Sequence, residues 1–230
     1  MTTVMILAAG RGERMRPLSD AVPKPLLVAG GKPLIVHLIE GLARADLRDI
    51  VVNHSHLGEK IVAALGDGRR HGVRIAYSHE AGGGLEAGGG IYQALDLIRG
   101  DPFIVVNGDI WTDYPFARLP RRLAGEAHLV LVDNPPHHPR GDFALRAGRV
   151  AAAGAPKLTF SGIGVYARRL FDGCRPGKFP LAPLLRQAME RGAVSGEHHA
   201  GRWLDVGTPE RLAELERALT GNGGTTDEHG

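Results

Sequence analysis

The chain has 230 residues, of which 43% are hydrophobic, and a formal net charge of +3 at neutral pH. This length suits one domain with a full core, and the balanced charge argues against nucleic acid as a partner. The longest apolar runs have strand length, so we expect no membrane segment. The single cysteine, Cys174, excludes an internal disulfide, and no signal-peptide pattern precedes the first apolar run, so we expect a cytoplasmic protein.

The first half of the chain alternates between strand-like and helix-like patterns. Strand-length apolar runs occur at residues 4–7, 49–53, 73–77 and 103–106, and helical spacing of apolar residues occurs at 34–45, 57–65 and 89–98. This alternation predicts a three-layer α/β fold, with a mostly parallel sheet and helices on both faces. Ligands bind beyond the carboxyl ends of strands in such sheets, so the loops after these strands should form one crevice.

The second half predicts a more mixed sheet. Extended segments are expected at residues 129–132, 143–145 and 158–166, with a hairpin around Gly148 and a helix over 180–188. Residues 194–198 and 202–204 could pair as short strands. Thr208 and Pro209 predict the start of a closing helix. We therefore expect one domain over residues 1–220, with no added β-helix domain, and a disordered tail over 221–230, which lacks apolar periodicity.

A glycine-rich loop follows the first strand. Residues 7–18 read LAAGRGERMRPL, and PKPL follows at residues 23–26. Backbone N–H groups in such a turn form a concave anion site, around which Arg14 and Lys24 can place positive charge. The dinucleotide fingerprint fails because Met15 stands where its third glycine belongs, and the Walker pattern lacks its Gly-Lys-Ser/Thr end. Another kind of phosphate loop and a simple solvated turn remain as interpretations.

Three further stretches carry candidate chemistry. Residues 81–90 have so few side chains that their backbone could wrap a nucleobase, although a flexible linker is the alternative. Asp109 and Asp205 each follow a predicted strand, where a helix-cap or turn role is the alternative. Mg²⁺ prefers oxygen ligands and needs only one or two protein carboxylates. These two aspartates are therefore candidate metal ligands.

The order of these motifs resembles that of the sugar-1-phosphate nucleotidyltransferases over residues 5–219. The resemblance implies that Arg14 neutralises the departing pyrophosphate, that Lys24 contacts the reacting phosphates, and that Asp109 and Asp205 hold Mg²⁺. A sugar phosphate is its own nucleophile because its second pKa is near ~6, so no general base is expected. The nucleotide-binding residues that the resemblance implies are Ala8, Gly10, Gly12, Glu13, Arg14, Lys24, Glu80, Gly84, Gly88 and Asn107.

Within this family the sequence is most similar to the N-acetylmuramate α-1-phosphate uridylyltransferases, through residues 107–114, 131–135, 138–143, 159–163 and 195–198. This similarity implies UTP and N-acetylmuramate 1-phosphate as substrates and a role in peptidoglycan recycling. The lactyl carboxylate of that sugar could form an ion pair with Arg140, Arg202 or a protonated His138. The implied substrate contacts are Asn107, Arg140, Gly141, Asp142, Ser161 and Gly162.

Two alternative functions stay open at this point. A mannose-1-phosphate guanylyltransferase is one, because the Glu80 carboxylate could accept both donors on the edge of guanine, whereas uracil offers one N–H there. A non-catalytic sugar-nucleotide-binding subunit is the other. The presence of Arg14, Lys24, Asp109 and Asp205 together argues against that subunit, since simple binding needs neither a metal nor a leaving-group cation. The oligomeric state, monomer or small homo-oligomer, is left undecided.

Overall fold

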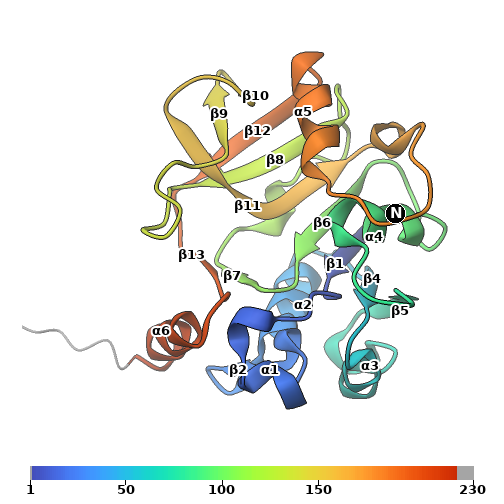
Figure 1. Cartoon of the computed structure of the whole chain (residues 1–230), viewed down its shortest axis with the longest axis vertical. Coiled ribbons are helices and arrows are strands. Elements are labelled where there is room, and N and C mark those ends of the chain that lie inside the picture. The colour runs from blue at the N-terminus through green and yellow to red at the C-terminus, as the bar shows by residue number, and fades with distance from the viewer. Residues whose placement is uncertain (1, 222–230) are drawn as a thin grey trace, which may run out of the picture.

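A nine-stranded sheet forms the centre of the protein, whose computed structural model describes residues 2–221 (Figure 1). The strand order is β5-β4-β1-β6-β11-β8-β12-β10-β9. The first four strands in this order are mutually parallel, as the alternating pattern predicted. They are β1 (Thr3–Leu7), β4 (Asp49–His54), β5 (Arg74–His79) and β6 (Phe103–Asn107).

Helices cover both faces of this sheet, which confirms the predicted layers. Along β1, Val4 and Ile6 pack into one apolar cluster and Met5 into another, because successive strand residues point to opposite faces. The helices α2 (Leu34–Arg44) and α3 (Gly58–Leu65) contribute to the first cluster, and α4 (Glu86–Ala94) and α5 (Ala182–Glu190) to the second. The sheet is therefore buried from both sides.

The second half of the sheet is mixed, as expected. β11 (Lys157–Tyr166) runs antiparallel to β6 and to β8 (Ala127–Val132), and β9 (Phe143–Arg146) and β10 (Arg149–Ala151) form the predicted hairpin. The predicted pairing of residues 194–198 with 202–204 is wrong. β12 (Val194–His199) instead runs parallel to β8 over six residue pairs, which extends the buried sheet much further than a short hairpin would.

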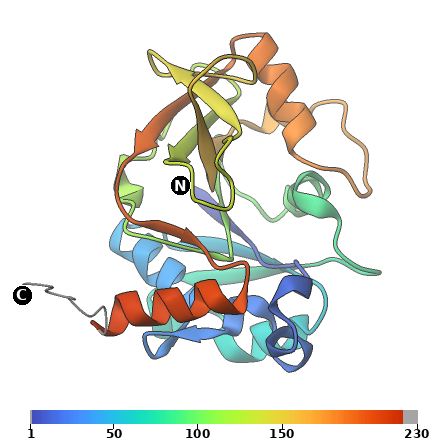
Figure 2. The ribbon, with the colours of Figure 1, turned by 60° about the vertical axis from the view of Figure 1, so that its left-hand side comes forward.

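The strand β13 (Trp203–Asp205) pairs with β7 (Ile110–Thr112), in a small sheet separate from the main one. Figure 2 shows the closing helix α6 (Pro209–Thr220) lying next to the N-terminal part of the chain, where it contacts β2 (Val28–Ala29). Thr208 caps α6 by accepting a hydrogen bond from the Arg211 N–H, as predicted. The tail expected over 221–230 lies outside the described residues, apart from Gly221.

The helix α4 corrects one expectation. It begins at Glu86 and ends at Ala94, so half of the predicted glycine loop is helical. Gly88 lies inside α4, where a Cβ atom would come within 2.6 Å of the Phe179 ring and 2.8 Å of the Phe179 carbonyl oxygen. The glycines therefore permit close packing of the helix, and this tertiary contact outweighs their poor helix propensity.

The remaining elements are short. They are α1 (Leu18–Ala21), β3 (Lys32–Pro33) and the 3-10 helices η1 (Glu13–Met15), η2 (Lys24–Leu26), η3 (Arg69–His71), η4 (Phe116–Arg118) and η5 (Arg168–Phe171). Within residues 2–221, no helix has the length and apolar character needed to cross a membrane.

Candidate active site

A cavity of about 820 Å³ lies at the carboxyl ends of the parallel strands. The loops after β1, β4, β5 and β6 all contribute to its wall, so the predicted crevice is present. Of the residues predicted to bind nucleotide or metal, the following line it: Ala8, Gly10, Glu13, Lys24, Glu80, Gly84, Asn107 and Asp109. Gly12, Arg14, Gly88 and Asp205 are outside this wall.

The loop after β1 is folded closely around Lys24. Gly12 has a φ of 66°, and a Cβ atom there would lie 3.2 Å from the Lys24 Cβ. A side chain at this position would be both strained and crowded. The Ser19 hydroxyl donates a hydrogen bond to the Gly12 carbonyl at 2.7 Å and the Met15 N–H another at 2.8 Å. These hydrogen bonds and the close approach to Lys24 therefore stabilise the conformation of the loop.

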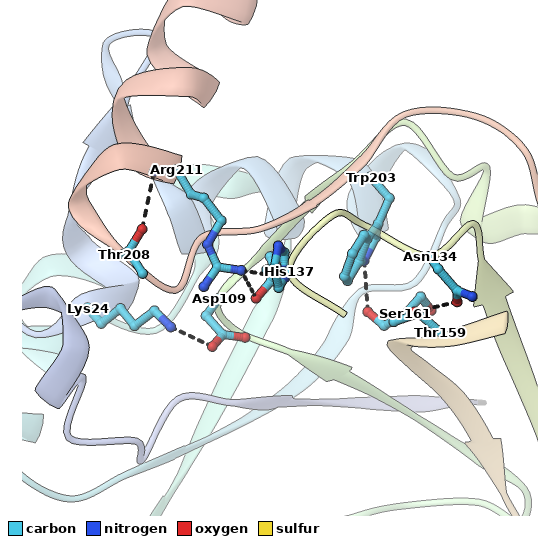
Figure 3. Close-up of polar contacts among 10 residues, drawn as sticks. Lys24, Asp109, Asn134, His137, Thr159, Ser161, Trp203, Thr208 and Arg211 are labelled. Atoms are coloured by element: carbon cyan, nitrogen blue, oxygen red, sulfur yellow. Dashed lines mark hydrogen bonds and ion pairs between the residues drawn. The ribbon is translucent and has the colours of Figure 1, made fainter. Parts of the chain in front are cut away.

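Lys24 and Asp109 form an ion pair at the wall of the cavity (Figure 3). The Lys24 Nζ donates to the Asp109 Oδ2 at 2.6 Å, and Lys24 is only 8% exposed although it carries a charge. The Asp109 side chain is 40% exposed. A cation and a carboxylate thus face the same space, where both can meet phosphate groups and their counterions.

The pairing of β7 with β13 brings Asp205 beside Asp109. Asp205 lies opposite Ile110 in that pairing, and the Val206 N–H donates to the Asp109 carbonyl at 2.8 Å. The Asp205 Oδ2 accepts a hydrogen bond from Arg211. Its buried Oδ1 accepts no hydrogen bond; the nearby His137 Nε2, 2.9 Å away, is itself hydrogen-bonded to Arg211 at 2.7 Å.

This pair of carboxylates suits a hard cation. Mg²⁺ takes one or two protein carboxylates and completes its shell with water and phosphate oxygens. The orphaned Asp205 oxygen is the kind of buried acceptor that such a cation satisfies. Among residues 2–221 there is no group of three or more His, Cys, Asp or Glu side chains placed to hold a metal, so these two carboxylates would act with ligand oxygens.

Two guanidinium groups lie near the same place. A Cβ atom on Gly207 would lie 3.3 Å from an Arg14 Nη and would also meet the Arg211 guanidinium, so both groups flank Gly207. Sequence reasoning missed Arg211, whose side chain is only 12% exposed. A basic residue in the first turn of a helix opposes the helix dipole, and that mismatch is the signal that could have pointed to a nearby anion.

The far end of the cavity is organised by Asn53, which was also missed. Its Oδ1 accepts a hydrogen bond from the Ala8 N–H at 2.7 Å, and its Nδ2 donates to the Glu80 Oε1 at 2.6 Å. The Glu80 Oε2 accepts from the Leu85 N–H at 2.7 Å. Glu80, which is 2% exposed, therefore uses both oxygens to tie loops together.

A second cavity of about 360 Å³ adjoins the first, and the two share Leu7, Glu86, Ala87 and Asn107 in their walls. Three of the predicted substrate residues, Asn107, Asp142 and Gly162, line the second cavity. Its other wall residues are largely apolar, including Phe143 and Phe160. A compact, partly apolar molecule in the second cavity would therefore lie next to a larger one in the first.

The other predicted substrate residues lie elsewhere. Arg140 is exposed, and neither it nor Gly141 lines either of these two cavities. Ser161 is 1% exposed, and its hydroxyl donates to the Val130 carbonyl at 2.7 Å and accepts from the Ile163 N–H at 3.1 Å. Trp203 donates to the Ser161 carbonyl at 2.9 Å (Figure 3). Ser161 therefore stabilises the irregular part of β11 and presents no free group to a substrate.

A family model described as nucleotidyl transferase matches residues 3–145. The chain belongs to the nucleotidyl transferase family. It is a sugar-1-phosphate nucleotidyltransferase, as the order of motifs predicted. This nucleotidyltransferase is 53% identical over 228 residues to the N-acetylmuramate alpha-1-phosphate uridylyltransferase of Neisseria meningitidis, covering 94% of this chain and 97% of that one.

A second relative of this nucleotidyltransferase is the protein of the same name from Caulobacter vibrioides, which is 33% identical over 234 residues, covering 94% and 96% of the two chains. Among solved structures, a putative glucose-1-phosphate thymidylyltransferase from Bacillus anthracis superposes with a TM-score of 0.83 at 22% identity, over 95% of each chain. That likeness confirms the fold.

Proposed function

We propose that this nucleotidyltransferase joins UTP and N-acetylmuramate α-1-phosphate to give UDP-N-acetylmuramate and pyrophosphate. The observation that carries the proposal is the 53% identity, over nearly the whole chain, to a relative of that name. The geometry supports it, since a donor in the larger cavity and an acceptor in the smaller one would meet at the wall that Leu7 and Asn107 share. In this proposal the enzyme acts in the cytoplasm, in peptidoglycan recycling.

The reaction needs alignment more than it needs a protein nucleophile. An oxygen of the sugar phosphate attacks the α-phosphorus of UTP, the new P–O bond forms, and the bond from that phosphorus to the pyrophosphate oxygen breaks. The attacking phosphate is largely dianionic at neutral pH, because its second pKa is near ~6. The enzyme then contributes by holding the two phosphates in line and by neutralising their charge.

Three cations of this chain could supply that neutralisation. Lys24 lies in the wall of the donor cavity, where we assign it to the α-phosphate and the attacking phosphate. Arg14 lies beside Gly207, with Arg211 next to it, and we assign both to the departing pyrophosphate. The backbone N–H groups of residues 10–13 would complete the phosphate site, as in other glycine-rich anion loops.

We further propose that Asp109 and Asp205 hold Mg²⁺. Bound there, the ion would neutralise phosphate charge and orient the phosphate oxygens. In the structure Lys24 balances Asp109 and Arg211 balances Asp205. Both cations belong to the proposed phosphate-binding groups, so they could turn towards substrate phosphates when the ion takes the carboxylates.

The guanine alternative depends on the Glu80 carboxylate. Each Glu80 oxygen already accepts one hydrogen bond, from Asn53 or from the Leu85 N–H, so fewer acceptor sites are left for a base. Backbone groups around Gly82–Gly84 are the remaining candidates for contact with the base, since these glycines line the same cavity.

The test is an assay of pyrophosphate release with one nucleoside triphosphate at a time. The purified protein would be incubated with Mg²⁺ and either N-acetylmuramate 1-phosphate or mannose 1-phosphate. We expect turnover with UTP and the muramyl phosphate. Turnover only with GTP and mannose 1-phosphate would overturn the substrate assignment. The absence of pyrophosphate release with every pair of substrates would favour a non-catalytic binding subunit.

A further inference from the structure

None of the cations first considered for the lactyl carboxylate faces the acceptor cavity. Arg140 lines neither cavity. Arg202 lies over the Trp111 ring, 5.1 Å from its centroid, and 3.6 Å from Asp113. His138 Nε2 lies 3.1 Å from Asp142 Oδ1. An acceptor with a carboxylate would need a different partner.

Of the residues between 2 and 221 that line that cavity, Arg186 alone carries a positive charge. It lies on α5, four residues after Ala182, and both residues line the cavity because positions four apart share a helix face. The neighbouring Leu185 is 2% exposed and anchors the helix to the core. The backbone that carries Arg186 is therefore fixed against the sheet, while its side chain is exposed.

The Arg186 guanidinium is also unengaged. Within residues 2–221 it makes no hydrogen bond or ion pair, whereas the two acids of the same wall have partners. Asp142 lies against His138 and accepts from the Phe160 N–H at 2.8 Å, and Glu86 lies 3.9 Å from Lys178. Arg186 keeps all five of its N–H donors available for a ligand.

The surroundings of Arg186 favour an anion. Among the described residues of its wall, Phe143, Phe160 and Leu185 are apolar, and Arg186 is the positive charge that a ligand carboxylate could meet there. The planar guanidinium matches a carboxylate through two parallel hydrogen bonds. Asn107 belongs to both cavities and Arg186 only to the smaller one, so a sugar with its phosphate at the junction would extend towards the wall of Arg186.

We propose that Arg186 binds the lactyl carboxylate of the acceptor sugar and determines the preference for a carboxylate-bearing sugar. This assignment rests on the proposed function, because it takes N-acetylmuramate 1-phosphate as the acceptor. It predicts that discrimination between N-acetylmuramate and N-acetylglucosamine, which lacks the lactyl group, depends on one side chain outside the nucleotide site.

The test compares two product nucleotides in binding experiments, so that it does not depend on turnover. Titration calorimetry would give the Kd of UDP-N-acetylmuramate and of UDP-N-acetylglucosamine for the wild type, Arg186→Gln and Arg186→Lys. We expect Arg186→Gln to weaken binding of the muramyl nucleotide about 10- to 100-fold, the usual effect of losing a charge-assisted hydrogen-bond pair, and to leave the other Kd unchanged. The Kd of the muramyl nucleotide for Arg186→Lys should lie between those for the wild type and Arg186→Gln, because lysine keeps the positive charge but not the two parallel N–H donors of the guanidinium.

Arg191→Gln is the matched control. Arg191 follows α5 directly and forms an exposed ion pair with Glu126, away from both cavities, so its loss should alter neither Kd. A wild-type preference for the muramyl nucleotide that persists in Arg186→Gln would overturn the assignment of Arg186 alone. A wild type without that preference would overturn the assignment together with the proposed acceptor.

Discussion

At the scale of single residues, Arg211 belongs both to a structural ion pair and to the candidate site. It is the hydrogen-bonding cation of Asp205, whose Oδ1 is buried without a hydrogen bond. A basic side chain in the first turn of α6 works against the helix dipole, at a cost of about 0.3–1 kcal/mol. The partnership with a buried carboxylate outweighs that cost.

We expect Arg211→Gln to lower the free energy of unfolding by about 2–4 kcal/mol without metal, because it removes the guanidinium from a mostly buried carboxylate and leaves only His137 beside it. Added Mg²⁺ should then restore more stability to the variant than it adds to the wild type, since the ion would compensate the Asp205 charge. Urea denaturation with and without Mg²⁺ measures both effects. Arg217→Gln, on the same helix, is the control, and an equal response to Mg²⁺ in Arg211→Gln and wild type would contradict Asp205 as a metal ligand.

His54 carries a prediction about pH. It is 8% exposed, its Nδ1 has no hydrogen bond, and its ring stacks on His79 with centroids 5.1 Å apart. Burial, and then the nearby His79, lower the pKa of His54 below its usual value. The unfolded chain therefore binds more protons than the native one below about pH 6.5, so the stability present above that pH is lost as the pH falls towards the lowered pKa.

We accordingly expect His54→Asn to reduce the dependence of stability on pH. Urea denaturation at about pH 7.5 and about pH 5.5 would give the loss of unfolding free energy on acidification for the wild type and the variant. The loss should be smaller in the variant, whatever its absolute stability, because the other histidines are common to both proteins. Equal losses would mean that His54 titrates alike in the folded and unfolded chains.

At the scale of elements, α4 packs against the segment around Phe179. A methyl group added at Gly88 would therefore have two opposing effects on stability. Gly88→Ala gains about 1 kcal/mol of helix propensity but places a Cβ atom 2.8 Å from a backbone oxygen that cannot rotate away. Overpacking of this kind costs about 1–3 kcal/mol. We expect net destabilisation by urea denaturation, whereas Gly84→Ala, whose nearest neighbour is 3.8 Å away, should change stability little. A more stable Gly88→Ala would show that the helix shifts freely.

The first residue of the same helix could not be predicted from the sequence. Regular apolar patterns located β1, β4, β6, β8, β11 and α2 to within a few residues, because their periodicity reflects local geometry. The boundary of α4 and the partners of β12 and β13 depend on contacts between distant segments, namely Phe179, β8 and β7. Glycine permits both a loop and a tightly packed helix, and only the tertiary neighbour decides between them.

At the scale of the whole molecule, the candidate site is assembled from loops that follow four strands, together with β13 and α6 near the end of the chain. Sequence motifs indicated Lys24, Asp109 and Asp205, because each is a charged residue in a short motif and has a side chain that suits phosphate or metal. Asn53 and Arg186 gave no such signal. Asn53 joins loops through hydrogen bonds and Arg186 lines a cavity, and local spacing encodes neither of these tertiary positions.

Because the larger cavity joins segments from residue 7 to residue 178, a ligand there should stabilise the whole fold and not a single loop. Binding at ~100 times Kd adds about 2.7 kcal/mol, which corresponds to a rise in Tm of ~5–10 °C for a domain of this size. We expect UTP with Mg²⁺ to produce such a rise in thermal denaturation, and EDTA to remove much of it. Lys24→Met should respond far less, because the Lys24 ammonium would no longer meet the phosphates. A rise of the same size in Lys24→Met would place the triphosphate away from the loop after β1.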